Sequence, residues 1–521
     1  MSEAATESGN GRSDDGRSAI ERLLGVFTDV KMGEGSSALL LTLNVFLLLT
    51  SYYIIKPVRD ALIIAMPNGP EYKSYMGGAI AVALLFAVPA YVAFAKKLPR
   101  NRLVVGATLF FVSHILVFAV GIRLPGSEAW LPLAFYLWVG IFNMMVVAQF
   151  WAFANDIYNE EQGKRLFALV GIGASAGAAV GGALAKWLPI RPAASLEGGC
   201  NAVTKQVGYL TTTQLLILSA VLLSLCALLS QIVHARETRA KSVATQGKQE
   251  DAGATGDGAA LEKAIAGAKA AERRGDGEQV KAQQDGAFAM VYKYRYLTLL
   301  AAFSLLFTLV NTNGEYMVGK LVKGFVFDAV GQCEFPNETV KKAFISGMFT
   351  SWYGDFYFYV NIAGVVLQSF AVSRLVKWGG LKLTFFVLPV IALFGAVAVL
   401  IFPLLSVLRP SKIAENSTDY SVNNTVRQML WLPTTRSMKY QAKQAVDTFF
   451  VRMGDVGSAL LVFTMASVLS ISDIRIFAAT NAVLVVVWLV LAARILNEQK
   501  VLKKMRDSGE WPDDDPEPAK G

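Results

Sequence analysis

Three ionisable side chains lie close together in an apolar stretch near the beginning of the chain. Lys56, Arg59 and Asp60 occur in YYIIKPVRDALII, at the i, i+3 and i+4 spacing that places them on one helical face. Pro57 removes a backbone hydrogen bond in the same turn and predicts a kink. Because guanidinium is a two-pronged donor and ammonium a compact charge, this face is suited to binding phosphate or carboxylate. Alternatively, Lys56 and Asp60 neutralise each other and Arg59 extends to the polar boundary of the segment.

Apolar segments in the second half of the chain contain six more charged side chains, namely Glu315, Lys320, Asp355, Arg427, Arg452 and Asp455. Charged groups inside a membrane segment are costly unless they face protein or water, so each is a candidate functional residue. Three roles are open for Glu315. It is a protonatable coupling group, it pairs with a basic residue across the bundle, or it only marks the outer end of its helix. Asp355 acts in gating or cation binding, or forms a structural salt bridge. Arg452 and Asp455 lie one turn apart and are expected to neutralise each other, which leaves Arg427 as the more available cation.

Further polar candidates lie in and after the fourth apolar segment. The amide side chains predicted to contact a bound solute are Asn143, Gln149 and Asn155. The charged groups that either form an ion-pair gate or only set the membrane topology are Asp156, Lys164 and Arg165. The aromatic side chains that could stack on a base are Tyr52, Tyr53, Phe150, Trp151, Trp352 and Tyr353, although aromatic residues are common in any helical bundle.

Motifs of several other protein classes are absent from the sequence. No GxxxxGK[ST] loop is present, which argues against a pump that hydrolyses ATP in the same chain. The two histidines and three cysteines have no metal-site or catalytic spacing, so we expect no metal, no cofactor and no enzymatic activity. No signal for nucleic-acid binding is found. Cys200 and Cys333 both fall in predicted outer loops, where a disulfide could join them.

The elements that position these residues are predicted to be membrane-spanning helices. Hydrophobic residues make up 54% of the 521 residues and charged residues only 17%, whereas about a quarter of a soluble protein is charged. Apolar residues occur in blocks near the ~20 residues that cross a bilayer as a helix. Six blocks in the first half lie at roughly 37–66, 75–95, 103–121, 130–155, 167–189 and 210–233. Six in the second half lie at roughly 296–318, 347–372, 383–407, 419–433, 447–470 and 475–494.

We therefore predict an all-α membrane protein of about twelve transmembrane helices in two six-helix bundles, like the major facilitator fold. The bundles are expected to occupy residues 37–234 and 296–495, and a polar linker residues 235–295. The remaining polar ends are residues 1–36 and 496–521. The chain is expected to act as a monomer.

Basic residues are concentrated in alternate loops, which predicts that both termini are cytoplasmic. Fewer basic residues are expected at the outer ends of the spans, where Arg409 and Lys412 are placed. No cleavable signal precedes the first span, and we expect a multi-pass protein of a bacterial inner membrane. The basic loops follow the second and fourth span of each half, which indicates an internal duplication. The run GIGASAGAAVGG from Gly171 follows no strand and is predicted to allow close helix packing, not dinucleotide binding.

Several blocks of the sequence resemble the ATP/ADP antiporter family of plastids and obligate intracellular bacteria. The most specific block is FWAFANDIYNEEQGKRLFALVGIGA from Phe150, in combination with YYIIKPVRDALII. YGDF at Tyr353 and AKQAVD at Ala442 are also similar. The resemblance implies a twelve-helix fold that exchanges ATP for ADP or takes up nucleotides with protons. By position it implies that Arg59, Glu315 and Lys443 are among the functional residues.

Two positions depart from the family pattern. The fourth span lacks the Glu that the family usually has, and Asp455 stands where the family has a Lys. Either change could alter the substrate, the coupling ion or the direction of transport. The leading hypothesis is a secondary transporter of nucleotides or related phosphorylated anions in a lipid bilayer. A proton-coupled transporter of another organic anion or peptide-like solute, and a membrane scaffold or sensor, are the alternatives.

Overall fold

The computed structural model shows a protein built almost entirely of helices. It describes residues 30–95, 100–158, 160–192, 206–255, 286–331, 333–435 and 438–508, together with residues 21, 24 and 28. Within these residues the only strands are the antiparallel pair β1 (Arg191–Pro192) and β2 (Gln206–Val207). Helices therefore carry nearly all of the candidate functional side chains.

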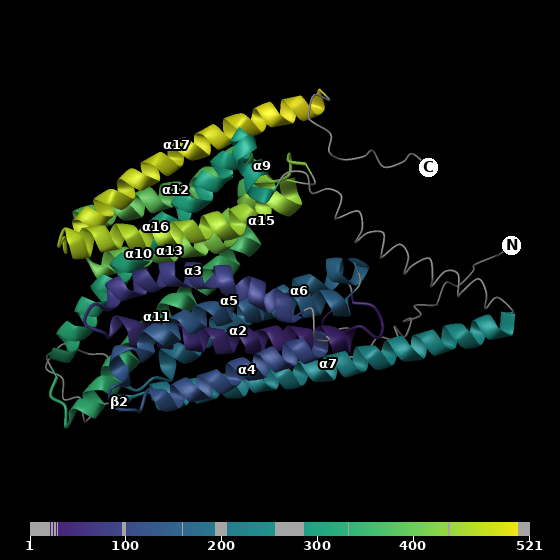
Figure 1. The fold of residues 1–521 in the computed structure, drawn as a ribbon, viewed down its shortest axis with the longest axis horizontal. Helices are drawn as coiled ribbons and strands as arrows, with labels where there is room; N and C mark the ends of the chain where they lie inside the picture. The colour runs from purple at the N-terminus through teal and green to yellow at the C-terminus, as the bar shows by residue number, and fades with distance from the viewer. Residues whose placement is uncertain are drawn as a thin grey trace, which may run out of the picture.

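Six long helices of the first half form one bundle, drawn from purple to teal in Figure 1. They are α2 (Gly35–Ile64), α3 (Gly69–Ala95), α4 (Arg100–Gly121), α5 (Leu131–Ile157), α6 (Glu160–Trp187) and α7 (Thr212–Thr255), with the short helix η1 (Ser127–Ala129) before α5. The central helix is α2, which packs against α5, α6 and α7 and also against α11 of the second half. Because several neighbours surround α2, most of its length is apolar on all sides.

The second half forms the other bundle, drawn from green to yellow. Its α-helices are α9 (Ala287–Lys293), α10 (Arg295–Gly331), α11 (Glu338–Val366), α12 (Val372–Ile401), α13 (Leu405–Thr418), α14 (Asn424–Leu430), α15 (Lys443–Ala445), α16 (Val451–Val462) and α17 (Ile474–Asp507). Short π-helical segments connect several of them, namely η2 (Leu367–Ala371), η3 (Asp419–Asn423), η4 (Met438–Ala442), η5 (Val446–Phe450) and η6 (Phe463–Val468). Such π-helical turns are frequent at functional sites.

Ten helical stretches of the described residues are long and apolar enough to cross a membrane. One of them, Glu338–Ile401, is interrupted at Gly380, whose φ of 58° breaks the helix, so it provides two crossings. A further segment of similar length, α13 with η3 and α14, is too polar to be identified by composition alone. The prediction of about twelve membrane helices in two bundles is thus confirmed for the described part of the chain.

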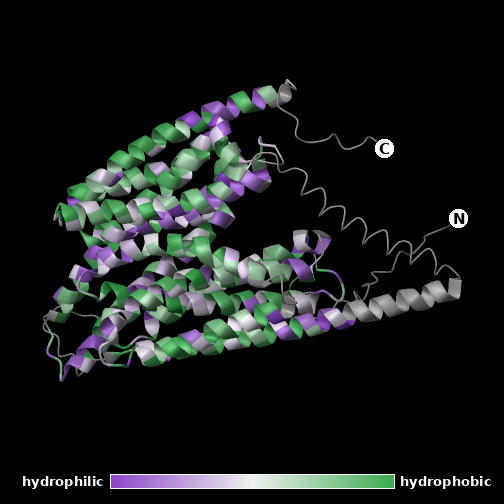
Figure 2. Ribbon diagram, in the orientation of Figure 1, coloured by the Kyte–Doolittle hydropathy of each residue, from purple (hydrophilic) through white to green (hydrophobic). Residues whose placement is uncertain are grey.

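Apolar residues occur along most of the helices of both bundles, as the colouring of Figure 2 shows. One buried cluster lies in the first half, a second in the second half, and a third contains residues of both halves, such as Ile64 and Phe356. Phe86 and Phe394 are 73% and 71% exposed, as expected of residues that face lipid. The protein therefore has its own cores and a separate apolar surface for the bilayer.

The glycine-rich run from Gly171 packs closely against a neighbouring helix, as predicted. A Cβ atom on Gly173 would lie 2.6 Å from the Thr42 carbonyl oxygen, and one on Gly181 would lie 2.5 Å from that of Thr50. Gly182 faces the other way, toward the Phe358 backbone of α11. Small residues on α6 thus allow close contact with α2 and with the second half.

Two helix boundaries differ from the prediction. The tenth crossing begins at Leu405, so Arg409 and Lys412, expected in an outer loop, lie inside α13. Lys412 is only 2% exposed, and its Nζ lies 2.9 Å from a Glu415 carboxylate oxygen. Because these polar residues recur along the helix, they lower its apparent hydrophobicity. In addition, α7 continues to Thr255, into the expected linker, of which residues 256–285 lie outside the described residues.

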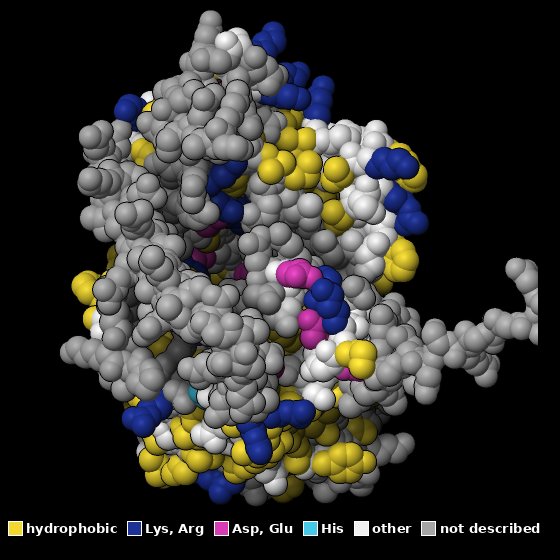
Figure 3. Space-filling view, turned by 90° about the vertical axis from the view of Figure 1, so that its right-hand side faces the viewer, with side chains coloured by type: hydrophobic (Ala, Val, Ile, Leu, Met, Phe, Trp, Pro, Cys, Tyr) yellow, Lys and Arg dark blue, Asp and Glu magenta, His cyan; other side chains and the backbone are white. Residues whose placement is uncertain are grey.

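The two bundles meet differently at their two ends. We call the end at which α2 begins and α17 ends the terminal end. At the opposite end Lys186 of α6 pairs with Asp355 of α11 at 2.5 Å, and Lys320 of α10 pairs with Glu71 of α3 at 3.9 Å. Viewed from the terminal end, the molecule is hollowed between the bundles, and charged side chains are visible inside (Figure 3). The bundles are therefore joined at one end and hollowed at the other.

Candidate functional site

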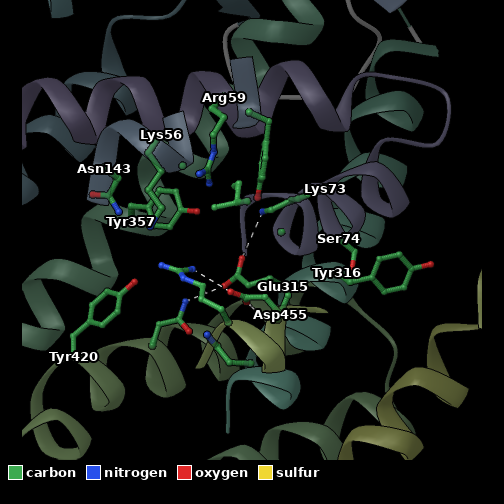
Figure 4. Close-up of a pocket in the computed structure, with 18 residues that line it drawn as sticks. Lys56, Arg59, Lys73, Ser74, Asn143, Glu315, Tyr316, Tyr357, Tyr420 and Asp455 are labelled. Atoms are coloured by element: carbon green, nitrogen blue, oxygen red, sulfur yellow. Dashed lines mark hydrogen bonds and ion pairs between the residues drawn. The ribbon is translucent and has the colours of Figure 1, made fainter. Parts of the chain in front are cut away.

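A cavity of about 240 Å³ lies between the two bundles (Figure 4). The first half contributes Lys56, Arg59, Lys73, Ser74, Gly77, Ile80, Tyr136, Gly140 and Asn143. The second half contributes Asn311, Thr312, Glu315, Tyr316, Tyr357, Asn416, Tyr420, Arg452 and Asp455. The predicted site residues among them are Lys56, Arg59, Asn143, Glu315, Arg452 and Asp455.

The charged face of α2 is organised around Asp60. This carboxylate is fully buried and accepts hydrogen bonds from Arg59 Nη2 at 2.8 Å and Arg59 Nε at 3.1 Å. Its second oxygen lies 3.7 Å from Lys73 Nζ and accepts a 2.7 Å hydrogen bond from Tyr357. The alternative in which Lys56 neutralises Asp60 and Arg59 extends outward is therefore wrong.

Lys56 has a different environment from the other cations of the cavity. Its Nζ lies 3.9 Å from the centre of the Tyr357 ring and 5.5 Å from that of Tyr53. No carboxylate lies within ion-pair distance of Lys56 among the residues that the structure describes. Such cation–π contacts stabilise an ammonium but leave its N–H groups available for an anion.

Glu315 connects the two halves at the cavity wall. Its carboxylate lies 3.6 Å from Lys73 Nζ of the first half and accepts a 3.1 Å hydrogen bond from Asn416 Nδ2. The possibility that Glu315 partners a base across the bundle is therefore confirmed. Lys73 was not predicted, because it lies two residues before the expected second span. The structural reason for its burial is the packing of α3 against α10 and α16.

Arg452 and Asp455 form a second charged pair, on the opposite wall. Arg452 Nη1 lies 3.1 Å from Asp455 Oδ2, as expected from their spacing on α16. Thr312 donates a 2.9 Å hydrogen bond to the other oxygen of Asp455. Arg427, expected to be the more available cation, lies outside the cavity and pairs with Asp447 at 2.7 Å. Arg452 is thus the arginine of the second half that lines the cavity among the described residues.

The charges of the cavity favour an anion. Among the described lining residues, four are basic (Lys56, Arg59, Lys73 and Arg452) and two are acidic (Glu315 and Asp455). Buried Asp60 balances one of the bases, which leaves one positive charge in excess. Lysine and arginine N–H groups that converge in a protected cavity bind phosphate or carboxylate groups well.

Aromatic groups of the cavity are tyrosines that differ from those predicted to stack on a base. Tyr136, Tyr316, Tyr357 and Tyr420 line the cavity, and the Tyr136 ring centre lies 4.2 Å from the Arg59 guanidinium. None of the six aromatic residues predicted for stacking is among the described lining residues. The spacing of aromatic residues along a helix does not reveal which side of that helix faces the cavity. The tyrosines of the cavity could therefore not be assigned from the sequence.

The structure places several other predicted residues away from the cavity. Gln149 is buried within the first half, and Asn155 and Asp156 are exposed near the terminal end of α5. Lys443 donates a 2.6 Å hydrogen bond to Gln428, near the same end. None of these residues is among the described residues that line the cavity, so their contact with a solute stays a prediction.

Two predicted groups belong to contacts at the opposite end. Asp355 binds Lys186 of the first half and Arg409 of its own half, which fits the structural salt bridge considered for it. Lys320 lies 3.9 Å from Glu71 and 3.3 Å from the hydroxyl of Tyr316. Both residues therefore help to join the bundles.

Arg165, one of the charged groups predicted either to form an ion-pair gate or to set the membrane topology, makes an ion pair within the first half, and a gate between the bundles stays a prediction. Arg165 donates hydrogen bonds of 3.0 and 3.1 Å to Glu34, which precedes α2. Burial opposes ionisation of Glu34, but the hydrogen bonds from Arg165, Gln162 and the Lys31 backbone lower the pKa of this carboxyl. The side chain of Lys164 lies outside the described residues. The Arg165–Glu34 pair fastens the start of α2 to α6.

The cysteines can be assigned in part. Cys333 forms a disulfide bond, whereas Cys226 is free and buried. Cys200, the expected partner of Cys333, lies outside the described residues. Within the described residues, no group of three or more His, Cys, Asp or Glu side chains is arranged to hold a metal ion.

Comparison with known sequences decides the family. The sequence model described as TLC ATP/ADP transporter matches residues 124–409 and 411–503 of the chain. The chain belongs to the TLC ATP/ADP transporter family. The resemblance predicted from the FWAFAN block is thus confirmed, and the family that it indicates is one of membrane transporters and not of enzymes.

A curated relative in the family is the ADP,ATP carrier protein 1 of Chlamydia muridarum (strain MoPn / Nigg). It is 23% identical to this chain over 391 residues, which are 70% of this chain and 65% of the relative. The chain therefore spans somewhat less than two thirds of the length of that protein.

Solved structures show the same fold in other transporters. A POT family transporter in complex with 5-aminolevulinic acid matches with a TM-score of 0.53 at 12% identity, over 90% of this chain and 96% of that chain. The peptide transporter POT in complex with sulfate gives 0.52 at 12% identity, over 94% and 99%. A mutant of the nucleoside transporter NupG gives 0.52 at 11% identity, over 88% and 99%. These similarities confirm the major-facilitator-like fold.

Proposed function

We propose that this protein is a secondary transporter of nucleotides, which binds their phosphate groups in the central cavity and moves them by alternating access. The observation that carries the proposal is the excess of basic side chains in this cavity, with Lys56 free of any carboxylate partner among the described residues. A phosphate chain supplies several negatively charged oxygens, which a set of lysine and arginine donors binds more strongly than neutral groups.

The arrangement of the bundles supports alternating access. In the present state the cavity lies beneath the hollow of the terminal end, and ion pairs such as Lys186–Asp355 join the bundles at the opposite end. Transport requires these contacts to break while the terminal end closes. One chain encloses the whole cavity, so we propose that the monomer is the transporting unit.

We further propose that the protein lies in a bacterial inner membrane with both termini in the cytoplasm. The distribution of basic residues among the loops supports this orientation. In this orientation the present state faces the cytoplasm, and the cavity would receive nucleotides from that side.

The proposal can be tested with purified protein in liposomes. We expect saturable uptake of labelled ATP or ADP that increases when the liposomes contain unlabelled nucleotide. Lys56→Gln should raise the apparent KM for ATP about tenfold or more, because loss of one charged hydrogen bond costs about 1.5–3 kcal/mol. Lys377→Gln, an exposed lysine outside the cavity, is the control and should transport like the wild type. Absence of any saturable nucleotide flux would reject the proposal.

Proton-coupled uptake of nucleotides or of another organic anion is a second candidate. It is favoured by Glu315, a carboxylate that lines the cavity between the halves and that could bind a proton during the cycle. A pH gradient should then drive accumulation without internal nucleotide, and Glu315→Gln should abolish this effect. Uptake that depends on internal nucleotide and ignores the pH gradient would instead establish exchange.

A further inference from the structure

Lys73 lies between two carboxylates that belong to different bundles. Its Nζ is 3.7 Å from Asp60 of the first half and 3.6 Å from Glu315 of the second, as the dashed line in Figure 4 marks for the latter pair. The side chain is only 8% exposed, and Nζ has no hydrogen-bond partner within the described residues. The charge of the Lys73 ammonium is thus balanced by the two carboxylates, but its N–H groups make no hydrogen bond to the part of the chain that the structure describes and remain available as donors.

The two carboxylates differ in how firmly they are held. Asp60 keeps its hydrogen bonds from Arg59 on the same helix, whatever the second half does. Glu315 has one hydrogen bond, from Asn416, and Lys73 is the only base within ion-pair distance in the described part of the chain. Lys412, the next base on that side, is occupied by Glu415 and Asn311. Glu315 therefore depends on Lys73 for its counter-charge.

Separation of the bundles at the end opposite the terminal end would pull α3 away from α10. Lys73 would stay with Asp60, because both belong to the first half, and Glu315 would lose its base. A buried charge without a partner is strongly unfavourable. The pair thus opposes the opening of that end when the cavity contains no substrate.

We propose that the Lys73–Glu315 pair is a lock on the empty carrier, and that a phosphate group of the substrate releases it by replacing Glu315 as the partner of Lys73. This inference rests on the proposed function, since it requires a phosphate in the cavity. Phosphate oxygens fill the unused donors of Lys73 and repel the Glu315 carboxylate, which keeps Asn416. The lock makes the change of state depend on bound substrate, as exchange transport requires.

The test measures the distance between the bundles directly. Spin labels are attached to Leu124→Cys and Lys341→Cys, which are exposed at the end opposite the terminal end, in the full chain in lipid nanodiscs. Cys226 is buried and should not react. We expect the wild type without nucleotide to show one short distance, and ATP or inorganic phosphate to add a longer one. Glu315→Gln should show the longer distance without any ligand. The fraction of molecules at this distance should be at least threefold higher than in the wild type.

Two further variants complete the design. Lys73→Met should also populate the longer distance without ligand, and ATP should no longer change the distribution. Asp447→Asn removes a carboxylate that pairs with Arg427 within the second half, so it should behave like the wild type. Because Glu315→Gln keeps the size of the side chain and an acceptor for Asn416, it should fold, which size-exclusion chromatography checks.

The possible results separate the lock from the transport function. If Glu315→Gln and the wild type have the same distances without ligand, the lock does not exist. If Glu315→Gln opens but neither ATP nor phosphate moves the wild type, release by phosphate is rejected. If both shifts occur while liposomes show no nucleotide flux, the lock stands and the proposed function fails.

Discussion

Tyr357 of α11 donates a 2.7 Å hydrogen bond to Asp60 of α2, across the boundary between the two bundles. The same tyrosine ring lies 3.9 Å from Lys56 Nζ. One side chain of the second half thus orients both the carboxylate that holds Arg59 and the lysine that has no carboxylate partner among the described residues. The position of the cavity cations therefore depends on contact between the halves.

Tyr357→Phe keeps the ring beside Lys56 and removes only the hydrogen bond to Asp60. A hydrogen bond to a charged group contributes about 1.5–3 kcal/mol, so we expect this variant to be less stable than the wild type by that amount. Thermal unfolding in nanodiscs measures the change. Tyr359→Phe, at a tyrosine that is 46% exposed, is the control and should unfold like the wild type. Equal stability of both variants would mean that the Tyr357 hydroxyl is not needed.

The close contact between α6 and α2 gives a second prediction. In Gly181→Ala the new methyl group would lie 2.5 Å from the Thr50 carbonyl oxygen and 2.7 Å from Tyr53 Cβ, so the helices must move apart. Overpacking of this kind costs about 1–3 kcal/mol. Gly171→Ala, in the same run, meets nothing within 4 Å and serves as the matched control. Both are compared by thermal unfolding, and a tolerant Gly181→Ala would contradict the packing described.

Lys412 provides a third prediction, because it is a buried lysine on a crowded helix. Its Nζ lies 2.8 Å from Asn311 Oδ1 and 2.9 Å from Glu415, and a Cβ on Gly314 would come within 2.9 Å of it. Lys412→Met leaves Glu415 without its cation and should destabilise the protein by about 3–5 kcal/mol. Lys412→Met combined with Glu415→Gln should recover a large part of this loss. Chemical unfolding of both variants decides, and a double variant no better than the single one would exclude the pair.

Glu34 gives a prediction about pH. Burial alone would raise its pKa, but hydrogen bonds from Arg165, Lys31 and Gln162 outweigh burial and lower the pKa in the folded protein. A lowered carboxyl pKa means that the stabilising contribution is complete above the ordinary value of about 4.3 and is lost as pH falls through the folded value. The backbone amides at the start of α2 should therefore be equally protected from hydrogen exchange between pH 8 and 5, and this protection should decrease at lower pH. Glu34→Gln should remove this pH dependence, and a change centred near neutral pH would contradict it.

The sequence predicts the fold and part of the cavity, for physical reasons that specific residues illustrate. Apolar length and basic loops identify most spans, but the tenth is obscured by polar residues such as Arg409 and Lys412, whose partners include Asp355 of α11 and Asn311 of α10. Helical spacing correctly pairs Arg452 with Asp455. It cannot show that Asp60 prefers Arg59 and Lys73 over Lys56, because that choice depends on how α3 and α11 pack against α2.

Asp455 stands where the family resemblance implies a lysine, and its charge opposes anion binding in this cavity. Its carboxylate holds Arg452 at 3.1 Å and accepts a hydrogen bond from Thr312. Asp455→Asn keeps an acceptor for Thr312 but removes one negative charge from the lining and frees Arg452. At an effective dielectric constant near 20, one unit charge several ångströms from a phosphate changes its energy by a few kcal/mol before screening by salt. We therefore expect Asp455→Asn to bind ATP about tenfold more tightly.

The gain should grow with the charge of the ligand, so it should be larger for ATP than for AMP and smaller at high salt. Binding to purified protein, measured by calorimetry at two salt concentrations, gives both comparisons. Asp447→Asn removes a carboxylate outside the cavity and should leave the Kd unchanged. Unchanged or weaker ATP binding by Asp455→Asn would mean that the phosphates lie away from Arg452, on the Lys56 side of the cavity alone.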